Sequence, residues 1–287
     1  MLSKISNSVC SAIFFLLIKL LSFLPLSIIH FLGGLLGQFF HLLKPNIMKT
    51  LIANITNSGI FKDPDENKKA IEENIKEMGK FVLESMAIWG SSQKKTLGWI
   101  RKVNNFELIE VALKKKNAVI FLSPHIGAFE IASIFYASIK PITILYRPSR
   151  KKCLEKWIKN GRTKGYINLV PTDKSGVRHL LLALKKGEAV GILPDQIASK
   201  GKGEWANFFE KPAYTITLIN KLSIKTNATV IIAVVERLPN SQGFDIHLEV
   251  IDPLSIENAA GLNLAIEKQI KKFPTQYMWN YDRYKQP

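Results

Sequence analysis

A histidine and a carboxylate stand five residues apart in segment 123–130, with the sequence SPHIGAFE. A histidine that a carboxylate orients can take a proton from a hydroxyl at neutral pH, so the pair suits a general-base dyad. On one helix, residues at this spacing point about 140° apart, so the chain must change direction between them. Gly127 permits such a turn without steric cost. We therefore expect His125 on a turn and Glu130 in the first turns of a following helix.

The elements that would position this pair follow from the alternation of apolar patterns along the chain. The apolar run directly before the pair is typical of a buried strand, and amphipathic helices alternate with strands after it. Strands are predicted at 118–122, 142–146, 168–170, 189–193, 229–236 and 244–250, and helices at 128–139, 151–164, 176–186, 213–226 and 262–272. This order predicts an α/β fold with a mixed, mostly parallel sheet covered by helices.

Polar residues follow several of the predicted strands at their carboxyl ends. They are His125, Arg147, the loop at Asp173, and Asp195. Ligands of open α/β sheets gather at this edge, so we expect the four positions to face one site.

The segment before the predicted sheet has its own signals. The sequence Asp63-Pro64-Asp65 predicts a helix start. Apolar residues at helical spacing in 70–88 then predict a core-facing helix. These apolar residues are Ile71, Ile75, Met78, Val82 and Met86.

The first part of the chain is mostly apolar from residue 9 to residue 43. So long a run is unusual in a soluble domain, and no clean signal-peptide cleavage site follows it. We expect a membrane-anchoring helical segment over 1–45 and one α/β domain over 46–287. A transmembrane helix would carry Lys19 as a costly interior charge. Alternatively, Pro25 and Gly33-Gly34 divide the run into two helices that dip into one leaflet.

Composition narrows the classes of partner. The 287 residues include 40 Lys+Arg against 23 Asp+Glu, a net charge of +17 that favours anionic partners such as a membrane surface or an acidic protein. No zinc-ligand spacing, RNP-like motif or compact basic helix indicates nucleic acid binding. No cluster of His, Cys and carboxylates predicts a metal, and we expect no cofactor. The two cysteines, Cys10 and Cys153, do not suggest a disulfide framework.

Four motifs stand in order: S-P-H-x4-E at 123–130, Y-R-P at 146–148, G-I-L-P-D-Q at 191–196 and W-N-Y-D-R-Y-K at 279–285. In this order they resemble the late acyltransferases of lipid A biosynthesis, within the lysophospholipid acyltransferase superfamily. The resemblance covers nearly the whole chain. It implies a glycerol-3-phosphate acyltransferase-like fold at the bacterial inner membrane, with the catalytic domain on the cytoplasmic side. It also implies acyl transfer from an acyl carrier protein thioester to a hydroxyl of an anionic glycolipid, a Kdo-modified lipid IVA precursor, in lipopolysaccharide biosynthesis.

The resemblance assigns roles to particular residues. His125 and Glu130 match the catalytic pair of the family, and Arg162 matches a functional arginine on the helix after the Y-R-P strand. Arg147 and Asp195 match two further motif positions, and with Arg162 they are expected to bind substrate. Arg147 is equally compatible with a surface salt bridge, and Asp195 with a structural role in its loop.

The expected chemistry is base catalysis without a covalent enzyme intermediate. His125 would deprotonate the acceptor hydroxyl, and Glu130 would orient the imidazole and stabilise its charged form. No G-x-S-x-G motif supplies a serine nucleophile. Backbone N–H groups around Gly127 are one possible set of donors to the oxyanion. Arg147 and Arg162 suit phosphate or sugar-acid oxygens.

Some residues depart from the family's pattern or allow two interpretations. Glu210 stands where the family has glycine after two phenylalanines, and Tyr281 and Asp282 replace a His-Arg pair in the terminal motif. These changes leave the role of the tail open. Three aromatic residues just before Glu210 either line an acyl-chain pocket or, as is more common for aromatic stretches, belong to the core. They are Trp205, Phe208 and Phe209.

Three other functions compete with this interpretation. A glycerolipid lysophospholipid acyltransferase shares the H-x4-D spacing, but that branch usually has Asn before His and a Glu-Gly-Thr-Arg element. Here the residue is Pro124, and the element is absent. A catalytically silent membrane lipid-binding protein is disfavoured by the retained His125, Glu130 and Arg162. A basic nucleic-acid-binding module is the most distant alternative.

Overall fold

The computed structural model describes residues 2–43, 45–149 and 151–287. Within this part of the chain a seven-stranded sheet has the order β1-β9-β8-β2-β5-β3-β4. The strands are β1 (Ile100–Asn104), β2 (Val119–Leu122), β3 (Ile142–Tyr146), β4 (Ile167–Pro171), β5 (Ala189–Ile192), β8 (Thr229–Arg237) and β9 (Phe244–Ile251). Strands β8, β2, β5, β3 and β4 are mutually parallel, and β9 pairs antiparallel with β8. The predicted mixed, mostly parallel sheet is confirmed.

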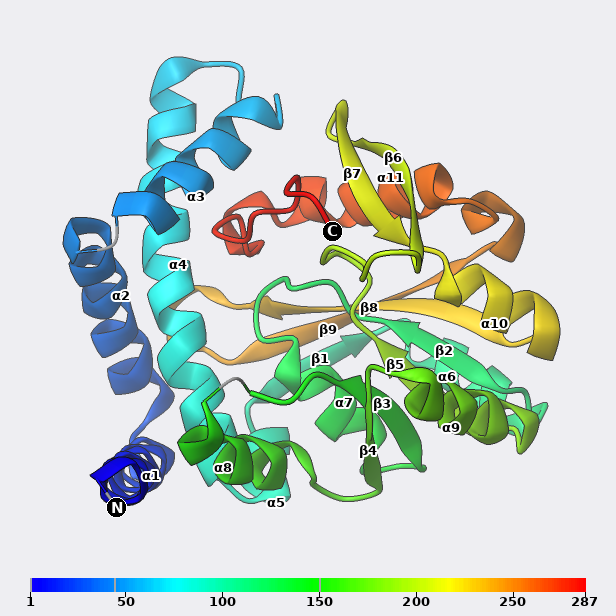
Figure 1. Cartoon of the computed structure of the whole chain (residues 1–287), viewed down its shortest axis with the longest axis horizontal. Coiled ribbons are helices and arrows are strands. Elements are labelled where there is room, and N and C mark those ends of the chain that lie inside the picture. Colours follow the sequence, from blue (N-terminus) through cyan, green and yellow to red (C-terminus); the bar gives the residue numbers. More distant parts are fainter. Residues whose placement is uncertain (1, 44, 150) are drawn as a thin grey trace.

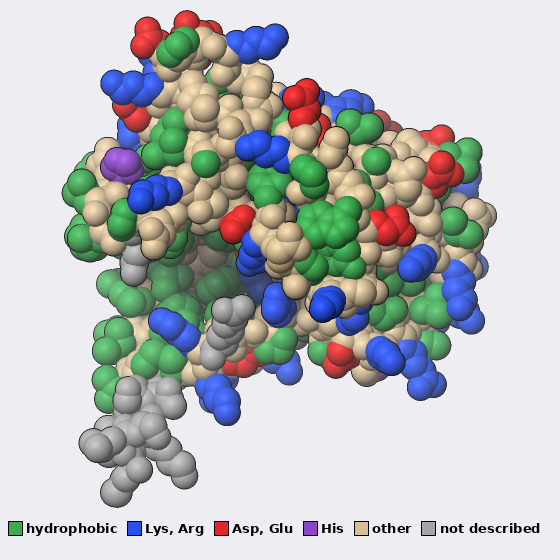
Figure 2. All heavy atoms as spheres, turned by 45° about the horizontal axis from the view of Figure 1, so that its top comes forward, with side chains coloured by type: hydrophobic (Ala, Val, Ile, Leu, Met, Phe, Trp, Pro, Cys, Tyr) green, Lys and Arg blue, Asp and Glu red, His purple; other side chains and the backbone are tan. Residues whose placement is uncertain are grey.

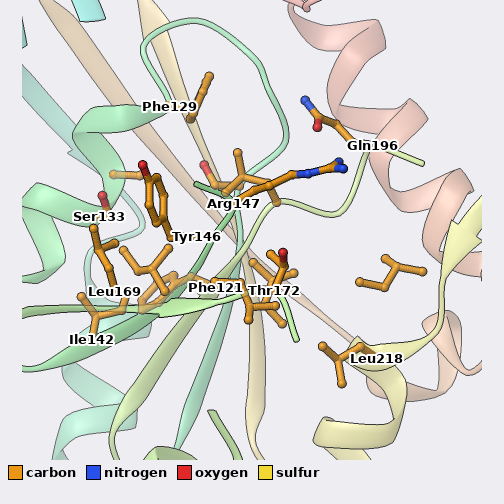
Figure 3. A pocket seen from close by; sticks show the side chains of 18 of the residues that line it. Phe121, Phe129, Ser133, Ile142, Tyr146, Arg147, Leu169, Thr172, Gln196 and Leu218 are labelled. Atoms are coloured by element: carbon orange, nitrogen blue, oxygen red, sulfur yellow. The ribbon is translucent and has the colours of Figure 1, made fainter. Parts of the chain in front are cut away.

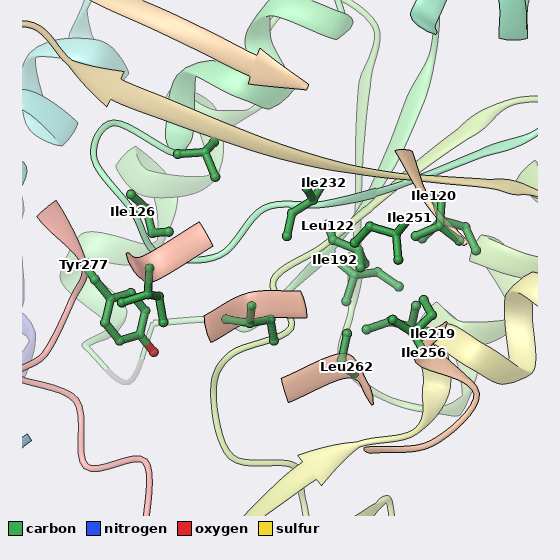
Figure 4. Packing of buried hydrophobic residues seen from close by; sticks show 14 of the residues in the cluster. Ile120, Leu122, Ile126, Ile192, Ile219, Ile232, Ile251, Ile256, Leu262 and Tyr277 are labelled. Carbon is green, nitrogen blue, oxygen red and sulfur yellow. The ribbon is translucent and has the colours of Figure 1, made fainter. Parts of the chain in front are cut away.

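Helices cover both faces of the sheet (Figure 1). One core lies under α9 (Lys174–Lys185), α10 (Leu218–Thr226), α11 (Ala259–Lys272) and the C-terminal segment, and Figure 4 shows its branched aliphatic side chains around Ile120 and Leu122. The other core lies under α6 (Glu107–Lys114) and α7 (Glu130–Tyr136), with α5 (Gln93–Leu97) beside α7. Alternate residues of each strand therefore enter opposite cores, as a doubly covered sheet requires.

One predicted helix differs from the structure, and several strands were not predicted. The expected helix at 213–226 divides into strand β7 (Lys211–Ile216) and helix α10, because β7 pairs with β6 (Gly203–Phe208) in a separate hairpin. The turn between them holds Phe209 at φ 46° and Glu210 at φ 62°. Both central residues of this turn are left-handed, a conformation that favours glycine. The turn therefore gives a physical reason for a glycine at the position that Glu210 occupies. Strand β1 was not predicted.

Helix α4 (Pro64–Gly90) begins at the predicted signal. The Asp63 carboxylate accepts hydrogen bonds from the backbone N–H groups of Asp65 and Glu66, and Pro64 occupies the first turn. Of the expected apolar stripe, Ile75 is buried and the other four residues are partly buried. Polar residues occupy much of the buried face, among them Asn74, Glu77 and Glu84.

The apolar N-terminal run forms two helices, α1 (Leu2–Phe23) and α2 (Leu26–Leu43), separated at Pro25. The glycines do not break α2, contrary to expectation. A Cβ on Gly37 would lie 2.0 Å from the Ile75 carbonyl oxygen, and one on Gly79 would lie 2.0 Å from the Gly33 carbonyl oxygen. The glycines therefore allow the backbones of α2 and α4 to approach closely, and α2 lies along α4 in Figure 1.

A buried ionic network ties α2 to the sheet domain. His30 of α2 contacts Glu84 of α4 at 3.0 Å, and the Arg237 guanidinium at the end of β8 donates to both Glu84 and Glu77. All four side chains are buried. Burial alone would lower the pKa of Arg237, but the two carboxylates raise it above its usual range, so its charge persists in the interior.

The outward faces of α1 and α2 remain apolar and exposed. In Figure 2 hydrophobic side chains gather along the column that these helices form at the left. The exposed side chains are Val9, Ile13, Leu16, Leu17, Leu20 and Phe23 on α1, and Ile28, Phe31, Leu32, Leu35, Phe39, Leu42 and Leu43 on α2. Among the described helices, α2 alone is long and apolar enough to cross a membrane by length and composition.

Candidate active site

The predicted polar positions meet at the carboxyl edge of the parallel strands. His125, Arg147 and Asp173 follow β2, β3 and β4, and all three line one cavity of about 790 Å³. Asp195 follows β5 and contacts His125. The volume lies within the roughly 300–1,000 Å³ typical of ligand pockets. The structure therefore brings the four predicted positions together at this edge, as expected.

The loop that carries His125 is fixed by backbone hydrogen bonds on both sides. The Gly127 N–H donates to the Gln276 carbonyl and the Ala128 N–H to the Val235 carbonyl, each at 3.0 Å. Gly127 has φ 56°, and a Cβ there would lie 1.9 Å from the Val235 oxygen, so glycine is required. Because Gln276 and Val235 accept the N–H groups of Gly127 and Ala128, these two groups are not free to bind an oxyanion.

The carboxylate that contacts the His125 ring belongs to Asp195. Asp195 Oδ1 lies 2.8 Å from His125 Nδ1, and Asp195 Oδ2 accepts the His125 backbone N–H at 3.1 Å. Burial alone would raise the pKa of Asp195, but the His125 ring and the hydrogen bonds from His125 lower it below its usual range. An ionised Asp195 therefore holds both the ring and the backbone of His125.

The other ring nitrogen of His125 faces the cavity. Gln196 Nε2 lies 3.2 Å from His125 Nε2, and both side chains line the cavity. A carboxylate can only accept, so Nδ1 carries the proton and Nε2 keeps its lone pair. That lone pair is the one a general base would use.

Glu130 does not contact the imidazole, contrary to the expected dyad geometry. Its carboxylate accepts from Arg162 Nε at 2.9 and 3.0 Å and from Arg162 Nη2 in a two-pronged ion pair. The backbone turn at Gly127 points Glu130 toward α8 (Lys152–Arg162), whereas Asp195 follows the strand next to that of His125. The sequence pattern therefore located both residues at the site but mispaired them.

Arg162 lines the cavity and lies close to two aromatic rings. Its guanidinium carbon is 5.5 Å from the centre of the Trp89 ring and 5.6 Å from that of Tyr146. Burial alone would lower the pKa of Arg162, but Glu130 raises it above the usual value. No protein hydrogen bond to Nη1 of Arg162 occurs among the described residues. This amino group is thus a fixed donor in a wall of the cavity.

The cavity has a polar opening and an apolar inner end. Figure 3 shows Arg147 and Gln196 at one end and Phe121, Ile142 and Leu169 at the other. Other apolar residues of the cavity lining are Ile109, Tyr136, Ile144, Ile246 and Leu248. The aromatic residues considered as pocket residues lie elsewhere, since Phe208 and Phe209 belong to the core under α11 and Trp205 is exposed.

Cationic side chains gather at the polar opening. Arg147, Lys174, Lys202 and Lys221 are exposed and line it. The partner of the Arg162 charge is Glu130, so these exposed residues supply the free positive charge of the site.

The C-terminal tail forms hydrogen bonds with the loops of the site, although its sequence departs from the family's terminal motif. The His125 carbonyl accepts the Met278 N–H at 3.0 Å, and the Tyr281 hydroxyl accepts the Ile197 N–H at 3.3 Å. Arg283 is buried and donates to the Tyr214 carbonyl and the Thr215 hydroxyl. The tail thus contacts the loops that carry the histidine and the aspartate.

The sequence missed several partners of these residues. Tyr277 lies beside Asp195, and burial together with the Asp195 charge raises the pKa of Tyr277 well above its ordinary value. Gln196 directly follows Asp195 in the G-I-L-P-D-Q motif, so that motif could have indicated its place at the site. Trp89 stands 73 residues before Arg162, and no sequence signal linked the two.

An oriented histidine at the sheet edge, beside a deep apolar cavity with a cationic opening, defines the site of an enzyme that acts on a molecule with an apolar chain and an anionic part. Acyltransferases are the class of enzyme that the fold and this site fit. The family model for bacterial lipid A biosynthesis acyltransferases matches residues 4–286, and the chain belongs to this family.

Individual relatives agree with this assignment. The lipid A biosynthesis palmitoleoyltransferase of Escherichia coli (strain K12) is 26% identical over 227 residues, which cover 77% of this chain and 73% of the relative. The lipid A biosynthesis lauroyltransferase of the same organism is 24% identical over 269 residues, which cover 91% of this chain and 87% of the relative. A lipid A biosynthesis acyltransferase of Haemophilus influenzae is 23% identical over 272 residues, covering 91% and 86%.

Proposed function

We propose that this acyltransferase moves a fatty acyl chain from an acyl carrier protein thioester to a hydroxyl of a Kdo-modified lipid A precursor, with His125 as general base. One observation carries the proposal. The buried Asp195 carboxylate fixes Nδ1 of His125, while Nε2 faces a cavity with an apolar end and a cationic opening. The acyl chain occupies the apolar end, and the acceptor reaches Nε2 from the opening.

The proposed reaction forms an ester and releases a thiol. Nε2 of His125 takes the proton of the acceptor hydroxyl as its oxygen attacks the thioester carbonyl. Asp195 stabilises the imidazolium, and the proton passes to the sulfur as the carbon–sulfur bond breaks. Ser123 does not act as a nucleophile in this scheme, because its hydroxyl donates to the Ala233 carbonyl at 3.1 Å. No covalent enzyme intermediate is needed.

Glu130 contributes through Arg162 in the proposed mechanism. The ion pair and the two flanking rings hold Arg162 in one orientation, with Nη1 not bonded to protein. A fixed donor of this kind suits an oxygen on which negative charge develops. Glu130 is thus a positioning residue for Arg162, and Asp195 is the positioning residue for His125.

The exposed cations suit the anionic parts of both substrates. Arg147 and Lys221 lie at the opening, where phosphate or sugar-acid groups of the acceptor can reach them. The net charge of +17 also favours an acidic acyl carrier protein as donor.

The exposed apolar faces of α1 and α2 support attachment to a membrane, which we propose is the bacterial inner membrane with the site on its cytoplasmic side. The close contacts of Gly33, Gly37 and Gly79, and the buried His30–Glu84 pair, hold α2 against the sheet domain along its length. This arrangement favours insertion of the outer faces into one leaflet over a helix that crosses the bilayer. The segment 1–45 is then an anchor that also packs on the 46–287 domain.

The test is a transfer assay with purified protein in detergent. Acyl carrier protein thioesters of graded chain length are combined with a tetra-acylated, Kdo-modified precursor, and products are identified by mass spectrometry. Wild type should add one acyl chain, and His125→Ala should lose activity by about 10²-fold or more, as expected for loss of a general base. His179→Ala, on the exposed surface of α9, is the matched control.

Two results would overturn the proposal. Absence of product with every donor would refute the transfer reaction, and equal activity of His125→Ala and His179→Ala would refute the assigned base. Preference for a glycerol-based lysolipid acceptor would support the competing glycerolipid acyltransferase function instead.

A further inference from the structure

A single row of residues crosses the sheet beneath the apolar end of the cavity. The pairing register places Ile231 of β8 beside Phe121 of β2, Phe121 beside Gly191 of β5, Gly191 beside Ile144 of β3, and Ile144 beside Leu169 of β4. Adjacent residues of such a row point to the same face of a sheet. Gly191 is the one member without a side chain, so the floor is hollowed at its centre.

No backbone requirement accounts for this glycine. Its φ is outside the left-handed region, where glycine would be needed. Glycine inside a strand is destabilising relative to alanine and often marks close approach of a ligand. A Cβ at this position would lie 3.2 Å from Ile144 Cγ1 and 3.6 Å from Ile142 Cδ1, and all three residues line the cavity. A small side chain therefore fits with slight adjustment, and it would fill cavity space.

The distance along β5 relates Gly191 to the reaction centre. Gly191 lies in β5, which ends at Ile192, and Asp195 follows in the loop after the strand. A fully extended chain spans about 3.3–3.6 Å per residue, so the four-residue step separates them by at most roughly 14 Å. A thioester carbonyl beside His125 would therefore direct the far end of an extended chain toward Gly191.

We propose that Gly191 sets the depth of the apolar end of the cavity and hence the longest acyl chain that the enzyme accepts. This inference rests on the proposed acyl-chain site. A side chain at Gly191 would make the apolar end of the cavity shallower, while the groups around His125 stay in place. The effect should therefore fall on chain-length preference more than on the rate with short chains.

The test compares Gly191→Ala and Gly191→Val with wild type in transfer assays over saturated donors from decanoyl to palmitoyl. Relative kcat/KM for the longest accepted chain over a shorter one should fall at least tenfold in Gly191→Val and less in Gly191→Ala. Val190→Ile is the matched control, because it adds bulk to the same strand on the opposite face. Gly191→Ala combined with Ile144→Ala should recover the longer chain.

A second measurement separates this inference from the transfer reaction itself. Free fatty acids of the same lengths compete with a fluorescent fatty acid for binding to each variant, with thermal unfolding as the check on folding. If wild type transfers no chain yet Gly191→Val selectively loses binding of the long fatty acids, the proposed reaction fails and the inference stands. An unchanged length profile in folded Gly191→Val, in binding and in transfer, would overturn it.

Discussion

Replacing Asp195 by Asn should nearly abolish catalysis while leaving the fold intact. Asp195 accepts two hydrogen bonds, from His125 Nδ1 at 2.8 Å and from the His125 backbone N–H at 3.1 Å. Asparagine has one acceptor oxygen, so one of these two donors must face its NH₂ group. If the oxygen keeps the backbone N–H, the ring has to shift its proton to Nε2, which removes the base. If the oxygen keeps Nδ1, the backbone N–H loses its partner and the loop is displaced.

We expect kcat to fall about 10³- to 10⁴-fold, the loss known for the equivalent substitution in a Ser-His-Asp triad, which corresponds to about 4–5.5 kcal/mol of transition-state stabilisation. Glu130→Gln should cost less, about 30-fold or ~2 kcal/mol, because it removes the charge but keeps one acceptor oxygen opposite Arg162 Nε and Nη2. Steady-state kinetics with acyl carrier protein thioesters and lipid acceptor measure both.

Asp252→Asn is the matched control, since Asp252 is exposed and caps a short helix away from the cavity. Thermal unfolding checks that each variant is folded. Activity of Asp195→Asn within tenfold of wild type, together with a Glu130→Gln enzyme as inactive as His125→Ala, would refute the assignment of Asp195 and restore Glu130 as the partner of the histidine.

Three further predictions concern stability, each measured by denaturant unfolding in detergent. Arg237→Met should destabilise the fold by about 3–5 kcal/mol, because Glu84 and Glu77 would stay buried without the guanidinium that they share and would keep only His30 and Lys80 as partners. A loss below 1 kcal/mol would contradict this. Burial lowers the pKa of Lys164 to about 8, so the unfolded chain binds more protons between about pH 8 and the unfolded value near 10.4. The free energy of unfolding of wild type relative to Lys164→Met should therefore rise with pH across that interval, and a flat or falling difference would exclude it. Glu210→Gly should stabilise the protein by up to about 1 kcal/mol, because it relieves the φ of 62° in the β6–β7 turn, and destabilisation would show that the Glu210 side chain matters more than the backbone.

Local sequence patterns were sufficient to predict the sheet type and the start of the longest helix. Alternating strand and helix signals identified the mostly parallel sheet, and Asp63-Pro64 marked the start of α4 because a helix cap acts within one turn. The hairpin β6–β7 was predicted as part of a helix, since its pairing depends on residues outside the local window. The same limit applies to α2, whose glycines looked like breaks in sequence but serve as contact points with α4.

The sequence by itself determined which residues reach the site, because strand ends of a parallel sheet meet at one edge: His125, Arg147 and Asp195 are there as expected. Only the tertiary structure decided which groups bond to each other. The turn at Gly127 directs Glu130 to Arg162, and the neighbouring strand brings Asp195 to the imidazole from 70 residues away. Hydrogen bonds depend on distances of a few tenths of an ångström, which spacing along one chain cannot specify when the partner comes from another strand.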